Sequence, residues 1–588
     1  MNEKKNPAIK EIFSLAFQNH QKNNFQIAEK LYKKILKINP NHFKSIFSLG
    51  TLLLQTQRFE LAKPLLHKAT QINPNYADAH NNLGIVFKEL GESQKAINCY
   101  EKAIQINPNY ADAHNNFGIV FKELGEHKKA ISSYQKAIEI QPDYASAHSN
   151  LGIVFNEIGE HKKAIGCYEK AIEIQPDYAV PHYNLGIVFK ELGEHKKAIT
   201  CYQKSIKIQP NRAVVHNSLG NVFKVLDDHQ KAITCYQEAL KLKSDFVGAQ
   251  ANISNIYISQ LDDSEKAISE SYKTLKMHHE ASKFINQRIS LYRLKHDVQQ
   301  AKYLSSKNYK INGIKKFQKI GNEILSRKEN GRDNGNSNKK ILLNHDEINS
   351  LLPFYKASHI YQTSKISESC INPHKNWHDV EEQYFNSPKQ IIYIDNFLSD
   401  EAVKELRAFC LVSKVWNREY KNKYLGAFSD RGFISPIHLQ IAINLKQKLP
   451  KLFGQHKLGK FWAFKYDSTL GKGINIHADF AIHNLNFWIT PDKYNNEKNT
   501  GGLKVYDAPA PEDWTFHKYN NTNADEISKF LSDNNAHCTN IPYKFNRAVL
   551  FNSAYFHETD KINFKNKYEA RRINITYLFG NRLVKKKN

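Results

Sequence analysis

The chain of 588 residues is longer than one hydrophobic core usually supports, so we expect two or more domains. Hydrophobic residues make up 41% of the sequence and aromatic residues 12%, which excludes an intrinsically disordered chain. The formal net charge of +26 would suit an acidic partner, but the sequence has no dense basic run with interleaved aromatic residues. We therefore do not expect nucleic acid as the partner.

The start of the chain and its cysteines bear on localisation. The first residues, "MNEKKNPAIKEIF", contain no long apolar run, and no stretch of the sequence has the length and apolarity of a membrane span. The seven cysteines include no CxxC pair, which favours packed thiols in a reducing compartment over a disulfide framework. We expect a cytoplasmic protein.

The N-terminal half repeats with a period of 34 residues. Glycines recur at this step at Gly50, Gly84, Gly118, Gly152, Gly186 and Gly220. One unit, from Ala113 to Tyr144, reads "AHNNFGIVFKELGEHKKAISSYQKAIEIQPDY". Its apolar residues follow helical spacing on both sides of a Gly-containing turn, and Pro142 would end the second helix. The period predicts a stack of helical hairpins.

This unit resembles the tetratricopeptide repeat. The family's small residue at the helix crossing corresponds to Gly118, its alanine after the turn to Ala130 and its aromatic residue to Tyr134. The resemblance implies about eight repeats over residues 9–280 that form an all-α superhelical solenoid. It also implies a concave groove that binds a polypeptide partner or substrate. Repeat one departs mildly, with Ala16 in place of the glycine.

The end of the array and the region after it are less regular. In the last repeat Ser254 replaces the glycine and Ser244 replaces the preceding proline. We expect degenerate capping helices over 281–310. A flexible, basic linker is expected over 311–340, where "SRKENGRDNGNSNKK" has almost no apolar residues. A helical support region over 341–389 would follow.

Two ladders of polar residues recur at the repeat spacing. The histidines His80, His114, His148, His182 and His216 are expected to serve packing, because stacked repeats hold them too far apart to share a metal ion. The amides are Asn82, Asn116, Asn150 and Asn184. They resemble the asparagine ladder in the repeat groove of the enzyme that attaches N-acetylglucosamine to protein Ser and Thr, which implies contacts with a peptide backbone. Alternatively, they bond neighbouring repeats.

Residues 390–588 change to a strand-rich pattern. Short runs of alternating apolar residues include "KFWAFKYD", "GINIHAD", "HNLNFWIT", "GGLKVYD", "RAVLFNS" and "RRINITYLFG", divided by Gly, Asn and Pro. Many short strands of this kind favour a sandwich or barrel of antiparallel strands. A jelly roll is the fold that we expect.

Polar residues interrupt three of these runs in a pattern that suits a metal site. In "GINIHAD" alternation places Asn475, His477 and Asp479 on one face of a strand. His557 follows another apolar strand in "NRAVLFNSAYFHETD". Two histidines and one carboxylate are the protein ligands of non-haem Fe(II) oxygenases, since they leave adjacent positions open for a cosubstrate and dioxygen.

The run "RRINITYLFG" adds a candidate cosubstrate anchor. Arg572, Asn574 and Thr576 share one face of the expected strand. A guanidinium group on the inward face of a strand is costly to leave unpaired. The distal carboxylate of 2-oxoglutarate would match it through two charge-assisted hydrogen bonds.

Together these residues resemble the 2-oxoglutarate- and Fe(II)-dependent oxygenase superfamily, on its prolyl 4-hydroxylase-like branch. The resemblance implies a double-stranded β-helix with iron ligands at His477, Asp479 and His557. It implies that Arg572 binds 2-oxoglutarate, with Asn574 from the same strand and Tyr466 from "FKYDSTLGKGINIHAD" in the cosubstrate pocket. Prolyl hydroxylases usually present Lys at the position of the arginine, so prolyl specificity is not implied.

The combination predicts a dioxygenase that uses Fe(II), 2-oxoglutarate and dioxygen, with ascorbate as an optional reductant. We expect it to hydroxylate a side chain of a polypeptide that the repeat array binds. Two alternatives stay open at this point. One is an oxygenase of small molecules such as sugar or lipid precursors, whose repeats assemble partners. The other is a noncatalytic interaction scaffold.

Overall fold

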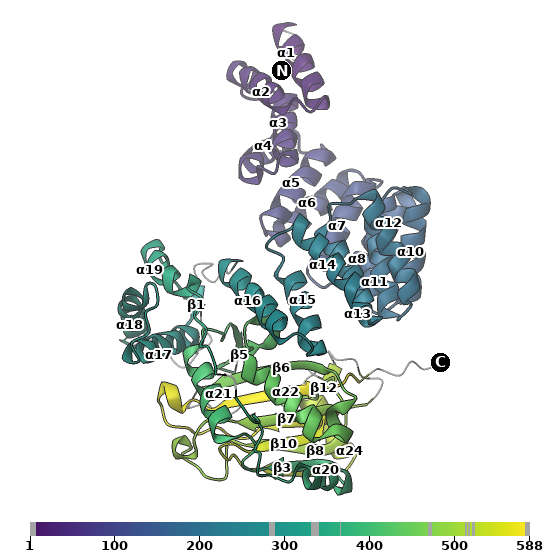
Figure 1. Ribbon diagram of the computed structural model, residues 1–588. Coiled ribbons are helices and arrows are strands. Elements are labelled where there is room, and N and C mark those ends of the chain that lie inside the picture. The colour runs from purple at the N-terminus through teal and green to yellow at the C-terminus, as the bar shows by residue number, and fades with distance from the viewer. Residues whose placement is uncertain are drawn as a thin grey trace. The chain divides into compact units, whose positions relative to one another are not determined.

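The computed structural model describes residues 7–281, 288–330, 340–364, 366–420, 422–467, 473–511, 514, 518–519 and 524–582. The chain divides into two compact units, Met1–Asp227 and Asp228–Asn588. Figure 1 shows helices throughout the first unit and a β-sheet with surrounding helices in the second. None of the described helices is long and apolar enough to cross a membrane.

The first unit is built from antiparallel helices in consecutive pairs. Its helices are α1 (Pro7–Gln21), α2 (Phe25–Ile38), α3 (Phe43–Gln55), α4 (Phe59–Ile72), α5 (Ala77–Glu89), α6 (Ser93–Ile106), α7 (Ala111–Glu123), α8 (His127–Ile140), α9 (Ala145–Glu157), α10 (His161–Ile174), α11 (Ala179–Glu191), α12 (His195–Ile208) and α13 (Ala213–Val225). The all-α repeat array predicted from the 34-residue period is confirmed.

The hairpins from α3–α4 to α11–α12 are each held by a glycine on the first helix and a large side chain on the second. A Cβ atom added at Gly118 would lie 2.7 Å from Cε1 of Tyr134, so only a glycine allows the two helices to approach this closely. Tyr134 and Ala130 are fully buried. The same contact recurs between Gly152 and Tyr168. The repeat therefore encodes one packing solution many times.

The histidine ladder has the packing role that was expected. The Nε2 atom of each of these histidines lies within hydrogen-bond distance of a proline carbonyl oxygen six residues earlier: His80 and Pro74, His114 and Pro108, His148 and Pro142, His182 and Pro176, and His216 and Pro210. These contacts join the end of one repeat to the first helix of the next.

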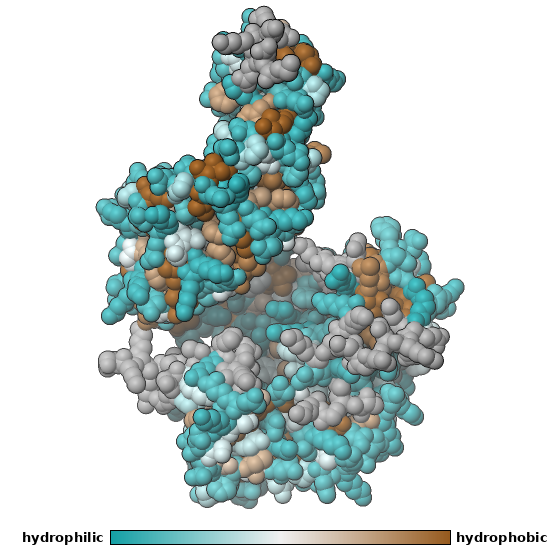
Figure 2. Space-filling model, turned by 180° about the vertical axis from the view of Figure 1, so that it is seen from behind, coloured by the Kyte–Doolittle hydropathy of each residue, from teal (hydrophilic) through white to brown (hydrophobic). Residues whose placement is uncertain are grey.

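The surface of the array in Figure 2 is largely hydrophilic, with separate apolar patches.

The second unit begins with the last helices of the array and contains helices of several lengths. They are α14 (His229–Leu242), α15 (Val247–Gln260), α16 (Ser264–Ala281), α17 (Leu291–Ser306), α18 (Ile314–Asn330), α19 (His345–Lys356), α20 (Trp377–Asn386), α21 (Asp400–Val412), α22 (Pro436–Lys448) and α24 (Ala524–Asp533). Helices α19 and α20 lie in the region 341–389 where supporting helices were expected.

The eighth helical pair packs against the β-rich region. The side chain of Asn255, on α15, donates a 3.2 Å hydrogen bond to Asp430, and the hydroxyl of Ser271, on α16, donates one of 2.6 Å to the backbone oxygen of Ser429. Helix α17, expected within a cap of the array, also contacts the β-rich region, where Gln299 accepts a hydrogen bond from Arg571. These helices are therefore part of the second unit.

The linker expected over 311–340 is a helix along half its length. Helix α18 spans Ile314–Asn330, and Phe317 and Ile324 are buried at 0% and 2% exposure. These residues are spaced to lie on one face, which packs in a cluster with Leu294 of α17. The many lysines of this segment lie between the apolar residues, and they gave the sequence the composition of a linker. Residues 331–339 of the expected linker lie outside the described residues.

The strands of the second unit form three antiparallel sheets. The strands are β1 (Arg288–Ser290), β2 (Lys340–Leu342), β3 (Ile391–Ile394), β4 (Arg418–Tyr420), β5 (Tyr424–Phe428), β6 (Leu458–Tyr466), β7 (His483–Trp488), β8 (Leu503–Pro509), β9 (Cys538–Ile541), β10 (Ala548–Asn552), β11 (Tyr555–Thr559) and β12 (Ile573–Phe579). One sheet has seven strands in the order β3-β10-β7-β12-β6-β5-β4, one has three in the order β11-β8-β9, and β1 pairs with β2. A β-rich region after the helical array is confirmed.

The central strands of the large sheet are buried on both faces. On one face Leu485 and Ile573 belong to a core that includes Phe409 of α21 and Ile441 of α22. Figure 1 shows α21 and α22 lying across this sheet. On the other face Trp488 belongs to a cluster with residues of the three-stranded sheet. The second face, between the two sheets, contains the polar residues described next.

Candidate metal centre

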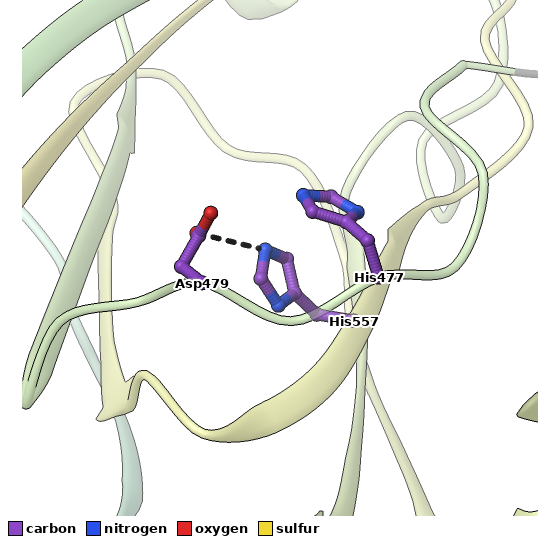
Figure 3. Close-up of side chains that lie close together, drawn as sticks. All are labelled: His477, Asp479 and His557. Carbon is purple, nitrogen blue, oxygen red and sulfur yellow. Dashed lines mark ion pairs between the residues drawn. The ribbon is translucent and has the colours of Figure 1, made fainter. Parts of the chain in front are cut away.

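Three predicted metal ligands converge in the second unit. Each of His477, Asp479 and His557 offers one ligand atom, and these atoms lie within 4.8 Å of one another. Nε2 of His557 is 3.5 Å from Oδ2 of Asp479. Figure 3 shows the three side chains directed toward a common point. Among the described residues, this is the group of His, Cys, Asp and Glu side chains that could hold a metal ion.

The backbone around His477 is not the strand that the alternation predicted. Residues 473–479 are irregular, apart from an isolated antiparallel bridge between His477 and His557. The two backbones exchange hydrogen bonds of 3.0 and 2.8 Å across this bridge. The backbone N–H of Asp479 instead donates a hydrogen bond to the carbonyl oxygen of Ser553. The bridge brings the two imidazoles together, and the bend after it lets the carboxylate face them.

Backbone carbonyls orient both imidazole rings. Nδ1 of His477 lies 2.8 Å from the carbonyl oxygen of Asn475, and Nδ1 of His557 lies 3.1 Å from that of Tyr555. A carbonyl oxygen can only accept, so each Nδ1 must be the protonated nitrogen. Each Nε2 then has a free lone pair, which is the form of histidine that binds a metal ion.

A chain of buried amides continues from Asp479 into the sheet. Nδ2 of Asn484 donates to Oδ2 of Asp479 at 2.6 Å, and Nδ2 of Asn486 donates to Oδ1 of Asn484 at 2.5 Å. Oδ1 of Asn486 in turn accepts from Asn574 at 2.8 Å and from Thr576 at 2.7 Å. Sequence reasoning did not assign Asn484 or Asn486, although the alternation in "HNLNFWIT" places them on one face.

Burial shifts the pKa values of His557 and Asp479 in opposite directions. It lowers the pKa of His557 well below its ordinary value, and the neighbouring His477 lowers it further. Burial raises the pKa of Asp479, while His477 and the hydrogen bond from Asn484 act in the opposite direction. A bound cation would offset the cost of burying the carboxylate.

Arg572 is buried in the same unit without a carboxylate partner. Its side chain is 1% exposed. Nε donates to the backbone oxygen of Gly501 at 2.6 Å and Nη2 to that of Gly502 at 3.2 Å. The guanidinium lies over the rings of Tyr466 and Trp488. In the part of the chain that the structure describes, Nη1 of this buried cation has no hydrogen-bond partner.

The surroundings of Arg572 connect it to the histidines. A Cβ atom at Gly502 would fall 1.9 Å from the backbone oxygen of Ile541, so a glycine is needed for the carbonyl to reach the guanidinium. The hydroxyl of Tyr466, which is fully buried, lies 3.5 Å from that of Thr559, two residues after His557 on β11. Asn574, next to Arg572 on the inner face, has an unpartnered Oδ1 among the described residues.

A cavity of about 570 Å³ adjoins this group. Its lining includes His477 and Asp479 together with aromatic residues from β4, β5 and β6. A volume of this size suits a small molecule or a few side chains of a polypeptide. The triad thus borders the cavity through His477 and Asp479, while Arg572 is buried.

The asparagine ladder of the array makes contacts between repeats. Nδ2 of Asn116 donates to Asn81 and Nδ2 of Asn150 donates to Asn115, both at 3.0 Å. Asn82 donates to Thr51 in the same way at 3.1 Å. Nδ2 of Asn184 lacks a hydrogen-bond partner among the described residues. The amide groups are half-buried, and in three of the four the donor is used by the preceding repeat.

Comparison with protein families identifies the array. Families described as tetratricopeptide repeats match residues 43–76, 77–110, 99–132, 143–211 and 177–245, and one described as a TPR repeat matches 118–159. The chain contains tetratricopeptide repeats. The resemblance inferred from the 34-residue period is confirmed for this part of the chain. The tetratricopeptide matches lie within residues 43–245.

Several solved structures are similar to this chain over part of its length. MamA is 30% identical, covering 29% of this chain and 93% of that chain with a TM-score of 0.26. The pilF protein of Pseudomonas aeruginosa is 23% identical over 35% of this chain and 95% of that chain, with a TM-score of 0.33. A tetratricopeptide repeat protein from Parabacteroides merdae is 16% identical over 42% and 98%, with a TM-score of 0.36. No curated protein matches the chain.

Proposed function

We propose that the second unit is an Fe(II)- and 2-oxoglutarate-dependent dioxygenase. The observation that carries the proposal is the convergence of His477, Asp479 and His557, with both imidazole Nε2 atoms free to bind a metal. The two facing antiparallel sheets support a double-stranded β-helix of the prolyl 4-hydroxylase-like branch. No other described group in the chain offers comparable metal ligands.

The donor set fits Fe(II). Two imidazole nitrogens and one carboxylate oxygen hold one face of an octahedral ion and leave the opposite face open. When bound, the iron would supply the activation of dioxygen that side chains cannot supply themselves. The residues of the chain would orient the ligands: backbone carbonyls fix the imidazoles, and Asn484 fixes the carboxylate of Asp479.

Arg572 is the anchor that we assign to 2-oxoglutarate. A buried guanidinium with one unpartnered amino group favours a carboxylate ligand, and charge-assisted pairs of this kind are strong. The guanidinium carbon of Arg572 lies 4.9 Å from the ring centroid of Tyr466, and Asn574 on β12 offers an unpartnered oxygen among the described residues. In the overall reaction one oxygen atom of dioxygen enters a substrate C–H bond as a hydroxyl group, the other enters succinate, and carbon dioxide leaves.

The tetratricopeptide array would recruit a polypeptide substrate, since repeat arrays present extended concave surfaces for binding. A second candidate is an oxygenase of small molecules whose array binds other partners. It is favoured by the contacts of Asn116 and Asn150, whose amide donors are used between repeats. Full turnover of every substrate by the double variant Asn116→Ala/Asn150→Ala would favour this second candidate.

Succinate formation tests the proposed reaction. The full chain, reconstituted with Fe(II) without oxygen and then given dioxygen, ascorbate and labelled 2-oxoglutarate, should release labelled succinate. His477→Ala and Asp479→Ala should reduce the rate to that of the metal-free protein. The control is His537→Ala, because the side chain of His537 is 77% exposed and lies outside the triad. Equal rates in wild type and both triad variants would refute the proposal and leave a noncatalytic scaffold.

A further inference from the structure

The cavity beside the triad has an aromatic wall. This wall is formed by Tyr420, Tyr424, Phe428, Trp462 and Phe464 of β4, β5 and β6. The strand register explains the wall, because Tyr420 pairs with Tyr424, and Phe428 pairs with Trp462 across β5 and β6. The rings of Tyr420 and Tyr424 stack with centroids 4.6 Å apart. The wall is therefore a continuous surface that suits an apolar side chain.

The cavity also has two cations. Nζ of Lys460 pairs with Asp430 at 3.1 Å, so its charge is already balanced. Arg418 lies on β4, at the edge of the large sheet, and is exposed. Its guanidinium carbon lies 5.0 Å from the ring centroid of Tyr420 and 5.7 Å from that of Phe428. No ion pair between described residues involves Arg418.

The acidic groups of the cavity do not balance this charge. Asp479 is the one carboxylate among the described lining residues, and the proposed metal ion would use it. Arg418 is thus a positive charge held over aromatic rings at the side of the cavity, with its donors available. Stacking on two rings restricts the guanidinium, which lowers the cost of ordering it when an anion binds.

We infer that the substrate of this site is an acidic polypeptide segment, in which an Asp or Glu lies beside the apolar residue that is oxidised. Arg418 would pair with the acidic side chain, and the aromatic wall would hold the apolar one next to the triad. A polypeptide accounts for the presence of the repeat array in the same chain. This inference rests on the proposed oxygenase function and names its substrate class.

Two synthetic peptide libraries test the inference with the full, Fe(II)-loaded chain. The libraries share random apolar residues at a central position and differ in the flanking residues, which are Glu in one and Gln in the other. Oxidation is read by mass spectrometry as the gain of one oxygen atom, and succinate is measured in parallel. The Glu library should react roughly tenfold faster, which is the scale of one charge-assisted hydrogen bond.

Arg418→Gln should remove the preference for Glu. The matched control is Arg288→Gln, an exposed arginine on β1 outside the cavity, which should retain the preference. Equal rates with the two libraries, or a preference that survives Arg418→Gln, would overturn the inference while the oxygenase function stands. Oxidation of acidic small molecules but of neither library would also overturn it. Loss of succinate formation with every substrate would instead refute the oxygenase function.

Discussion

The repeat array is held together by contacts between residues close in sequence, whereas the site in the β-rich region is formed by residues far apart in sequence. In the array, Gly118 contacts a tyrosine half a repeat away, and the same contact returns in the next repeat. In the β-rich region, Arg572 is held by the carbonyl of Gly501, 71 residues earlier, and His477 pairs with His557. Local contacts that recur can be read from a period. A site made by distant segments depends on the topology that joins them.

The comparison also separates the consequences of substitution. A change in one repeat should be felt mainly by the neighbouring repeats, because each contacts only the next. A change in the buried polar chain between Asp479 and Asn574 should affect binding at the site, because these hydrogen bonds join β12 to β7 and β7 to the segment that contains Asp479.

Substitution of Arg572 should have the largest effect. Arg572→Gln should weaken the binding of 2-oxoglutarate by about 1.5 to 3 kcal/mol, the scale of a hydrogen bond to a charged group. The affinity of Arg572→Lys for 2-oxoglutarate should lie between those of the wild type and Arg572→Gln, because lysine keeps the charge but lacks the paired donors of a guanidinium group. Equilibrium binding without oxygen measures this order, and thermal unfolding checks that the variants are folded. An unchanged dissociation constant in Arg572→Gln would remove the assignment.

Substitution of Gly118 should be the most damaging change in the array. Gly118→Val forces the ring of Tyr134 to move, and overpacking of this kind costs about 1–3 kcal/mol. Gly166→Val is the matched control, because a Cβ atom there meets nothing within 4 Å. Denaturant unfolding compares the two. Succinate formation without a polypeptide substrate should stay unchanged in both, and a loss in Gly118→Val alone would show that the regions are not separable.

Removal of the hydrogen bond to Asp479 should weaken metal binding. Asn484→Ala deletes the donor that holds Oδ2 of Asp479, and loss of such a partner costs roughly tenfold in metal affinity. Asn563→Ala serves as control, because Asn563 bonds to Glu497 outside the triad. Competition between the protein and a chelator measures the affinity. Equal affinities of the two variants would mean that Asn484 does not position the ligand.

The last effect develops only as the pH rises and concerns Lys414, a buried lysine of the second unit. Burial lowers its pKa to about 7, and its ammonium group donates to the backbone oxygens of Phe354 and Ala357. An unfolded lysine titrates near pH 10.4, so between about pH 7 and 10 the unfolded state binds more protons and stability rises with pH. In Lys414→Met this contribution is absent. The unfolding temperature of the wild type, relative to that of Lys414→Met, should therefore rise between about pH 7 and 10. Parallel pH dependences of the two unfolding temperatures would mean that Lys414 does not titrate in this range.

Much of the second unit's site followed from the sequence, and the exceptions have physical reasons. The spacing of His477, Asp479 and His557 identified the cluster, but alternation predicted a strand where the backbone is irregular. Alternation reports which residues share a face and not whether a neighbouring strand is present to pair with them. Asn484 and Asn486 were missed because their role depends on Asp479, which lies outside their strand.

The array shows the converse. Its helices, their ends and the packing of Tyr134 follow from the period, because each contact is local. The limit of the array was harder to predict. Helices α15 and α16 keep the helical spacing but pack against the β-rich region, as the hydrogen bond between Ser271 and Ser429 shows. Helix α18 was missed because lysines between Ile314, Phe317 and Ile324 gave the segment the composition of a linker.

The central claim is that one site binds a metal through the triad and 2-oxoglutarate through Arg572. The most direct measurement is anaerobic titration of the full chain with 2-oxoglutarate in the presence of Fe(II), followed by visible absorption, since a chelated 2-oxo acid gives Fe(II) a charge-transfer band. We expect a saturable band in wild type, none in Asp479→Ala, and a shift to higher concentration in Arg572→Gln. Absence of the band in folded, Fe(II)-loaded wild type at saturating 2-oxoglutarate would contradict it.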